Sequence, residues 1–65
     1  MSISDVEKIE DEVNKWVSEG DSEAFNELQK LSKSRSQWQI DQSLESYNRL
    51  LNSVHGARLW LDLRR

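Results

Sequence analysis

The side chains that could carry chemistry in this sequence are ten serines and a single histidine, His55. Nucleophilic catalysis by serine needs a nearby base, usually histidine, and an acidic group that orients the base. His55 directly precedes Gly56, a position where an imidazole commonly contacts the last carbonyl groups of a helix. We therefore expect His55 to be a helix-end residue, and we expect no enzymatic activity.

Metal and cofactor sites are equally hard to build from these residues. The chain has no cysteine and only one histidine, which excludes a zinc site of the Cys/His type. Glu10, Asp11 and Glu12 are consecutive, so on a helix their side chains fan out over different faces instead of converging on an ion. The two glycines are too far apart to form a phosphate-binding loop. We expect no cofactor, no metal and no small-molecule substrate.

Charge is distributed unevenly along the chain. Residues 1–24 carry eight acidic and two basic side chains, a net charge of −6, whereas residues 25–65 carry seven basic and four acidic ones, a net charge of +3. The acidic segment can lie against the basic one, within the chain or between copies, or both can be solvated helix faces. Basic residues cluster within 30–35 and 58–65, but a pI near 5.0 argues against phosphate binding. We expect no nucleic-acid partner.

A chain of 65 residues forms one domain at most, and a domain of this size buries only about 60% of its unfolded surface. Apolar residues in the first segment recur at spacings of three and four, which predicts a helix over residues 4–18 that Ser4 can cap. Gly20 suits a turn over residues 19–22, and Asp21 or Ser22 can cap the next helix. No stretch approaches the roughly 20 apolar residues of a membrane span.

The second segment predicts a long helix over residues 22–55. Its polar stretch at 32–36 is either a break or one exposed turn, and the absence of Gly and Pro favours a continuous helix that ends at His55 and Gly56. The tail, residues 57–65, suits a short helix better than a lone strand. The sequence therefore predicts an all-α helical hairpin with a short C-terminal helical segment. The expected hairpin core consists of Val6, Ile9, Val13, Trp16, Phe25, Leu28 and Leu31.

A second apolar stripe begins at Ile40 and lies about half a turn away from the stripe that ends at Leu31. A continuous helix would then be apolar on two sides, and one hairpin partner covers only one side. Tryptophan is enriched at interaction hot spots, and we expect at least one of Trp38 and Trp60 to face a partner. The expected protein interface consists of Trp38, Leu44, Tyr47, Leu51, Leu59, Trp60 and Leu63.

The middle of the chain resembles the needle subunits of bacterial type III secretion systems, across roughly residues 13–54. The resemblance is carried by Asp21-Ser22-Glu23, Glu27-Leu28-Gln29, Ser36, Trp38 and Ser43. It implies a helical hairpin that assembles into a filament and is secreted without a cleaved signal. The sequence differs from the family in lacking Pro in the turn, and it has Leu51-Asn52 where the family often has Lys-Asp. Small helical co-chaperones of the same systems are similar in pattern.

We therefore expect a non-catalytic protein–protein interaction module that packs helices against copies of itself, in its most specific form a needle-like filament subunit of a secretion system. The alternative is a discrete adaptor, chaperone or inhibitor that docks one helical face on a single protein target. Residues 1–24 carry eight acids and no long apolar run, which is unlike a secretory signal. A cytoplasmic location is expected, or secretion without a cleaved signal if the protein is a needle subunit.

Overall fold

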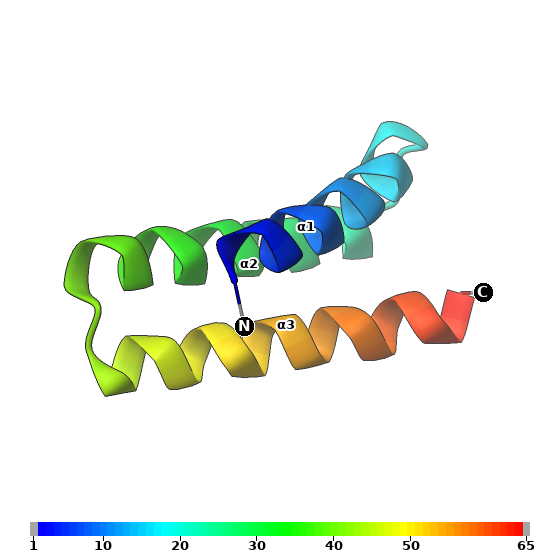
Figure 1. Cartoon of the computed structure of the whole chain (residues 1–65). Coiled ribbons are helices and arrows are strands. Elements are labelled where there is room, and N and C mark those ends of the chain that lie inside the picture. The colour runs from blue at the N-terminus through cyan, green and yellow to red at the C-terminus, as the bar shows by residue number, and fades with distance from the viewer. Residues whose placement is uncertain (1, 65) are drawn as a thin grey trace.

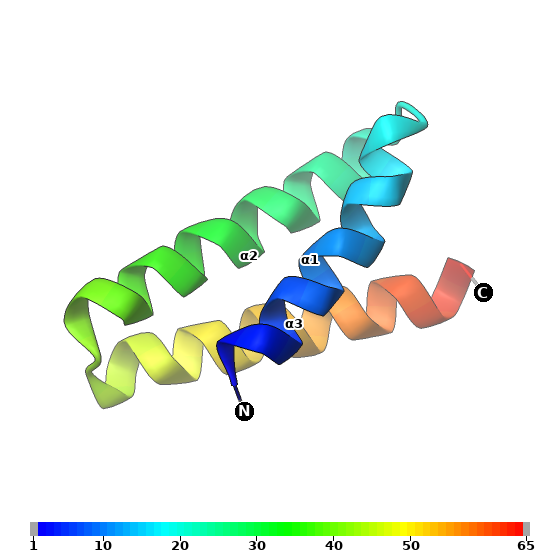
Figure 2. The same ribbon diagram turned by 45° about the horizontal axis from the view of Figure 1, so that its top comes forward.

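The computed structural model describes residues 2–64, and this part of the chain is entirely helical outside two short turns. The helices are α1, Ile3–Ser18, α2, Ser22–Asp41, and α3, Leu44–Arg64 (Figure 1). Helices α2 and α3 run in opposite directions side by side, and α1 packs on both of them (Figures 1 and 2). The result is a rod of 34 × 17 × 17 Å, with α1 over only one part of its length.

Helix α1 begins at a reciprocal cap. The Asp5 amide donates to Ser2 Oγ at 3.3 Å, and the Ser2 amide donates to Asp5 Oδ2 at 3.5 Å. Hydrogen bonds with the Ser2 backbone and hydroxyl lower the pKa of Asp5, because they favour its ionised form. The cap is thus Ser2, two residues before the expected Ser4. At the other end Gly20 adopts φ 89°, and Asp21 caps α2 by accepting from two amides.

The long helix expected over residues 22–55 is interrupted, but not at the polar stretch 32–36, which is helical. The interruption lies at Gln42 and Ser43. Gln42 has φ 50°, and its backbone N–H donates to the Trp38 carbonyl at 2.8 Å. This left-handed C-cap ends α2 although the sequence has neither Gly nor Pro there. Ser43 Oγ then accepts from the Ser46 amide at 3.2 Å and starts α3. Because the chain reverses here, α3 turns a different set of residues to the core. Leu50, Val54, Ala57 and Leu61 are buried, whereas Ile40 and Leu44 of the second apolar stripe are exposed.

The expected helix end at Gly56 is also wrong. Helix α3 continues without interruption to Arg64, so the expected separate segment 57–65 is part of α3, as far as the described residue 64. Ala57 and Leu61 are buried against the other helices. Glycine weakens the interior of a helix but does not by itself end it. Burial of Ala57 and Leu61 offsets this weakening, so the helix continues through Gly56.

The core lies where all three helices meet. It is formed by Val6, Ile9, Val13, Ala24, Leu31, Leu50, Val54, Ala57 and Leu61. Trp16 and Leu28, both expected in the core, are partly buried and pack against it. Phe25, also expected there, is instead 49% exposed. The reason is its position: Ala24 points into the core, and the next residue on an α-helix is rotated by about 100° from it.

Polar groups also join the helices. Arg35 Nε donates to Glu10 Oε1 at 2.6 Å, and Ser32 Oγ donates to Glu10 Oε2 at 3.4 Å, so an acid of α1 pairs with the basic stretch of α2. The hydroxyls of Ser34 and Ser53 meet at 2.8 Å between α2 and α3. As far as residues 2–64 describe them, none of the three helices combines the length with the apolar character of a membrane span.

Candidate protein interface

The end of the α2–α3 hairpin extends beyond α1. Both views show that the last turns of α2 and the first turns of α3 have no third helix beside them (Figures 1 and 2). Ile40 and Leu44, on either side of the turn, are 84% and 75% exposed. Large apolar side chains this exposed and this close together are typical of interaction surfaces.

Two aromatic rings form the base of this end. The rings of Trp38 and Tyr47 are tilted against each other with their centroids 6.0 Å apart. Both side chains are half-buried. We call Trp38, Ile40, Leu44 and Tyr47 the tip surface; three of them were expected at an interface, and Ile40 was not. Ile40 could have been found from its place in the second apolar stripe, next to the turn.

A separate hollow lies farther along α3. Leu51 and Arg58 are seven residues apart and so lie within about 20° of each other on the helix surface. Together with Val54, they line a hollow of about 430 Å³, whose rim also includes Asn52 and His55. We call this hollow the α3 groove. Leu51, expected at the interface, is therefore in its wall.

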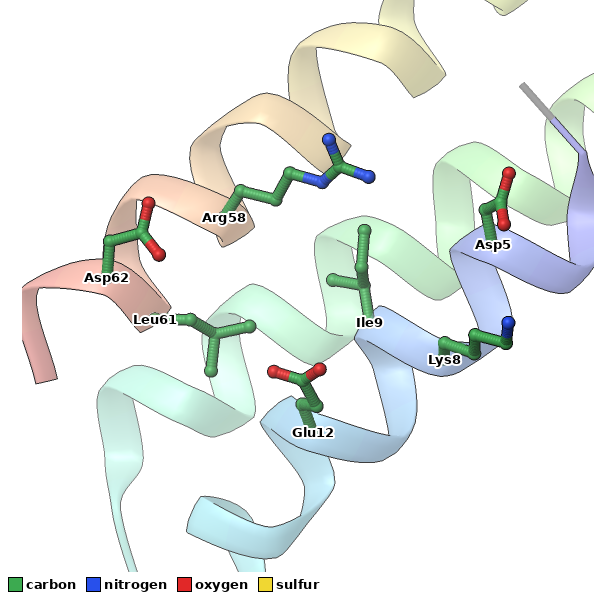
Figure 3. Close-up of a pocket in the computed structure, with 7 residues that line it drawn as sticks. All are labelled: Asp5, Lys8, Ile9, Glu12, Arg58, Leu61 and Asp62. Atoms are coloured by element: carbon green, nitrogen blue, oxygen red, sulfur yellow. The ribbon is translucent and has the colours of Figure 1, made fainter. Parts of the chain in front are cut away.

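Arg58 also borders a second hollow, of about 280 Å³, between α1 and α3 (Figure 3). Its floor is formed by Ile9 and Leu61, which are both buried. The rim carries charges of both signs from the two helices: Asp5, Lys8, Glu12, Arg58 and Asp62. In Figure 3, the Arg58 side chain extends from α3 toward α1 above Ile9. Both hollows are open and shallow.

The other three expected interface residues lie at the opposite end of α3. Leu59 and Leu63 are 54% and 86% exposed, one helical turn apart. Trp60 is half-buried and packs against the core, with its ring edge-on to that of Trp16 at 6.2 Å between centroids. Its indole N–H donates to Glu23 Oε2 at 3.2 Å. Trp60 therefore contributes to the fold, and the expected interface divides into two groups far apart.

Arg64 joins the ends of all three helices. Its guanidinium donates to Asp21 Oδ2 at 3.0 Å and to Glu23 Oε2 at 2.8 Å, and it lies over the rings of Trp16 and Trp60. Partial burial raises the pKa of Asp21, but hydrogen bonds from the Ala24 and Glu23 amides and the charge of Arg64 together outweigh it. The net pKa of Asp21 lies below its usual value.

Among residues 2–64 no three His, Asp or Glu side chains come together as metal ligands. His55 is exposed on α3, in the middle of the helix and not at its expected end. No protein-family model, curated protein or solved structure matches this chain.

Proposed function

We propose that this protein is a non-catalytic interaction module that packs its helices against copies of itself through the tip surface. The observation that carries the proposal is the pair Ile40 and Leu44, which are 84% and 75% exposed beside the α2–α3 turn. The neighbouring Trp38–Tyr47 pair provides a half-buried aromatic surface on which a second chain can pack. Aromatic residues of this kind dominate the energetics of protein interfaces.

The expected strength of this contact follows from the apolar surface. Complete burial of Ile40 and Leu44 would contribute about 3–6 kcal/mol, at about 1.5–3 kcal/mol for each side chain. Association also loses translational and rotational freedom, at roughly 4–15 kcal/mol. The tip surface alone therefore supports a weak contact. A tighter assembly needs a complementary surface with additional polar or charged pairs.

The test is light scattering after size-exclusion chromatography, over a wide range of protein concentration. The apparent mass should rise with concentration for the natural chain, and Ile40→Glu together with Leu44→Glu should keep it at the monomer. The matched control is Gln39→Glu with Asn48→Glu, which adds the same charge at exposed neighbouring positions and should leave association unchanged. A natural chain that stays monomeric at every concentration would exclude self-packing.

In its most specific form, the proposal is a needle-like filament subunit of a secretion system. Growth without a fixed end point would support this form, and electron microscopy would then reveal filaments. Contacts between two different surfaces of one subunit generate open chains of this kind when the rotation between subunits does not close a ring.

A second candidate function is a discrete adaptor, chaperone or inhibitor of one protein target. It is favoured by the hollow between α1 and α3, where a buried floor of Ile9 and Leu61 is surrounded by charged side chains (Figure 3). An amphipathic helix of a partner fits such a groove. A monomer that gains thermal stability only with its partner would favour this function.

A further inference from the structure

Asp41 occupies an electrostatically unfavourable position. It is the last residue of α2, whose final turn contains no basic side chain. The C-terminal end of a helix carries partial negative charge, so a carboxylate there is disfavoured. Within residues 2–64, Asp41 accepts hydrogen bonds only from Gln37 Nε2 and Ser43 Oγ and forms no ion pair. The fold of the single chain therefore does not explain why this residue is acidic.

Arg58 has the opposite charge and is likewise unpaired. It is exposed on α3, and the ion pairs of the described chain do not include it. It stands at the rim of the α3 groove, where exposed His55 is also titratable, and it borders the hollow between α1 and α3, whose rim carries Asp5, Lys8, Glu12 and Asp62. The groove offers the half-buried side chain of Leu51 as its apolar wall, next to the buried Val54 and beneath this basic edge. It is thus suited to an apolar segment that carries an acidic side chain.

We propose that the hairpin tip of one copy docks in the α3 groove of the next, with Asp41 facing Arg58. This inference rests on the proposed self-association and names the surface that the tip surface contacts. Ile40 and Leu44 flank Asp41 at the tip, as Leu51 and Val54 lie beside Arg58 in the groove, so apolar meets apolar and acid meets base. Complementary charges of this kind fix the register of a contact.

The contact forms between chains and not within one. Leu44 and Arg58 lie on the same helix 14 residues apart, which separates them by about 21 Å at 1.5 Å per residue. A rigid helix cannot bring its own first turn onto its own middle. Each copy therefore offers one tip and one groove, and the contact is heterologous. Repetition of such a contact leaves a free tip at one end and a free groove at the other.

The first experiment mixes two complementary variants. One variant, Ile40→Glu with Leu44→Glu, has a damaged tip and an intact groove. The other, Arg58→Glu with His55→Glu, has an intact tip and a damaged groove. All four side chains are exposed in the folded chain, so the substitutions should not disturb the core. Circular dichroism should therefore show unchanged helicity. Each variant alone should be monomeric, and their equimolar mixture should form dimers that do not grow further.

The second experiment exchanges the charges. Asp41→Arg or Arg58→Asp alone should weaken association at least about tenfold at low salt, because like charges then face each other. The double variant should restore affinity to within about threefold of the natural chain, a difference of less than about 0.7 kcal/mol. Asp41→Arg also removes the unfavourable charge at the end of α2, so loss of association cannot be attributed to a weakened helix.

The outcomes separate the two proposals. A natural chain that does not associate removes both. Association of the natural chain with a purely monomeric mixture, or with no effect of the charge exchange, overturns the tip-in-groove contact and leaves self-packing by another surface. Dimers in the mixture together with recovery in the charge-exchanged double variant support the contact.

Discussion

The guanidinium of Arg64 lies over the ring of Trp60, with 3.8 Å between Cζ and the ring centroid. The same group contacts the ring of Trp16 and donates to two carboxylates at the start of α2. A stacked and bidentate guanidinium cannot be replaced by lysine without loss of geometry. The last turn of α3 is therefore held by the other two helices, although the neighbouring Leu63 is 86% exposed.

The low pKa of Asp21 makes this cluster sensitive to acid. Because the folded pKa lies below the unfolded one, the stabilisation by Asp21 is fully present above about pH 4 and is lost as pH falls through the folded pKa. Asp5 contributes in the same direction. Urea unfolding of Asp21→Asn should show its largest loss of stability at pH 6 and almost none near pH 2. An equal loss at both pH values would contradict an ionic role for Asp21.

The two glycines should respond to alanine in opposite ways. Gly56 lies inside α3, and a Cβ there would meet nothing within 4 Å, so Gly56→Ala should raise stability by about 0.5–1 kcal/mol. Gly20 has φ 89°, where an L side chain is strained, so Gly20→Ala should lower stability. Thermal unfolding of both variants checks this pair. Destabilisation by Gly56→Ala would instead indicate that α3 ends at Gly56.

Leu31 should be among the most sensitive positions in the core. Its side chain is 0% exposed, and truncation to alanine removes buried surface and leaves a cavity. We expect Leu31→Ala to lower the free energy of unfolding by about 2–5 kcal/mol, which is a large share of the stability of a small domain. Leu63→Ala removes the same atoms from an exposed position and should change stability by less than about 0.5 kcal/mol. Chemical denaturation of the two variants measures the contrast.

Glu10 should matter more than other acids of α1. Its carboxylate accepts from Arg35 and Ser32 while only 13% exposed. Glu10→Gln should cost about 1.5–3 kcal/mol, the range for hydrogen bonds to charged groups, because it leaves Arg35 without its partner. Glu7→Gln, at an exposed position of the same helix, serves as the control. Similar small effects for both variants would show that the Glu10–Arg35 pair contributes little.

The all-helical class follows from the spacing of Val6, Ile9 and Val13, because periodicity of 3.6 residues is a strong signal. A lone strand over residues 57–65 would have had no partner strand. The number of helices does not follow. The α2–α3 turn depends on Gln42 in a left-handed conformation, which a sequence without Gly or Pro at that point hides. At Gly56 the sequence predicts a helix end that the structure does not have. Burial of Ala57 and Leu61 stabilises the helix through a residue that usually ends one.

The candidate interface could be predicted only in part. Leu44 and Tyr47 belong to an apolar stripe for which the sequence predicts no partner in the chain. In the structure Val54 of that stripe lies in the core, while Ile40 and Leu44 are exposed. What leaves the tip exposed is the shorter length of α1, which no local pattern encodes. Trp60 was expected at the interface but bonds within the chain. Its partner Glu23 is 37 residues away in sequence, so local patterns do not reveal the contact.

The short connections of this fold have a kinetic consequence. Only a few residues separate α1 from α2 and α2 from α3, so most contacts form between neighbours along the chain. Helical proteins with such local contacts fold in about microseconds to milliseconds. The Arg64–Asp21 bond closes a loop of 43 residues and should form after the helix pairs have docked. Arg64→Gln should then accelerate unfolding and leave the refolding rate unchanged in stopped-flow experiments, so that Arg64 sets the lifetime of the folded chain and not the speed at which it forms.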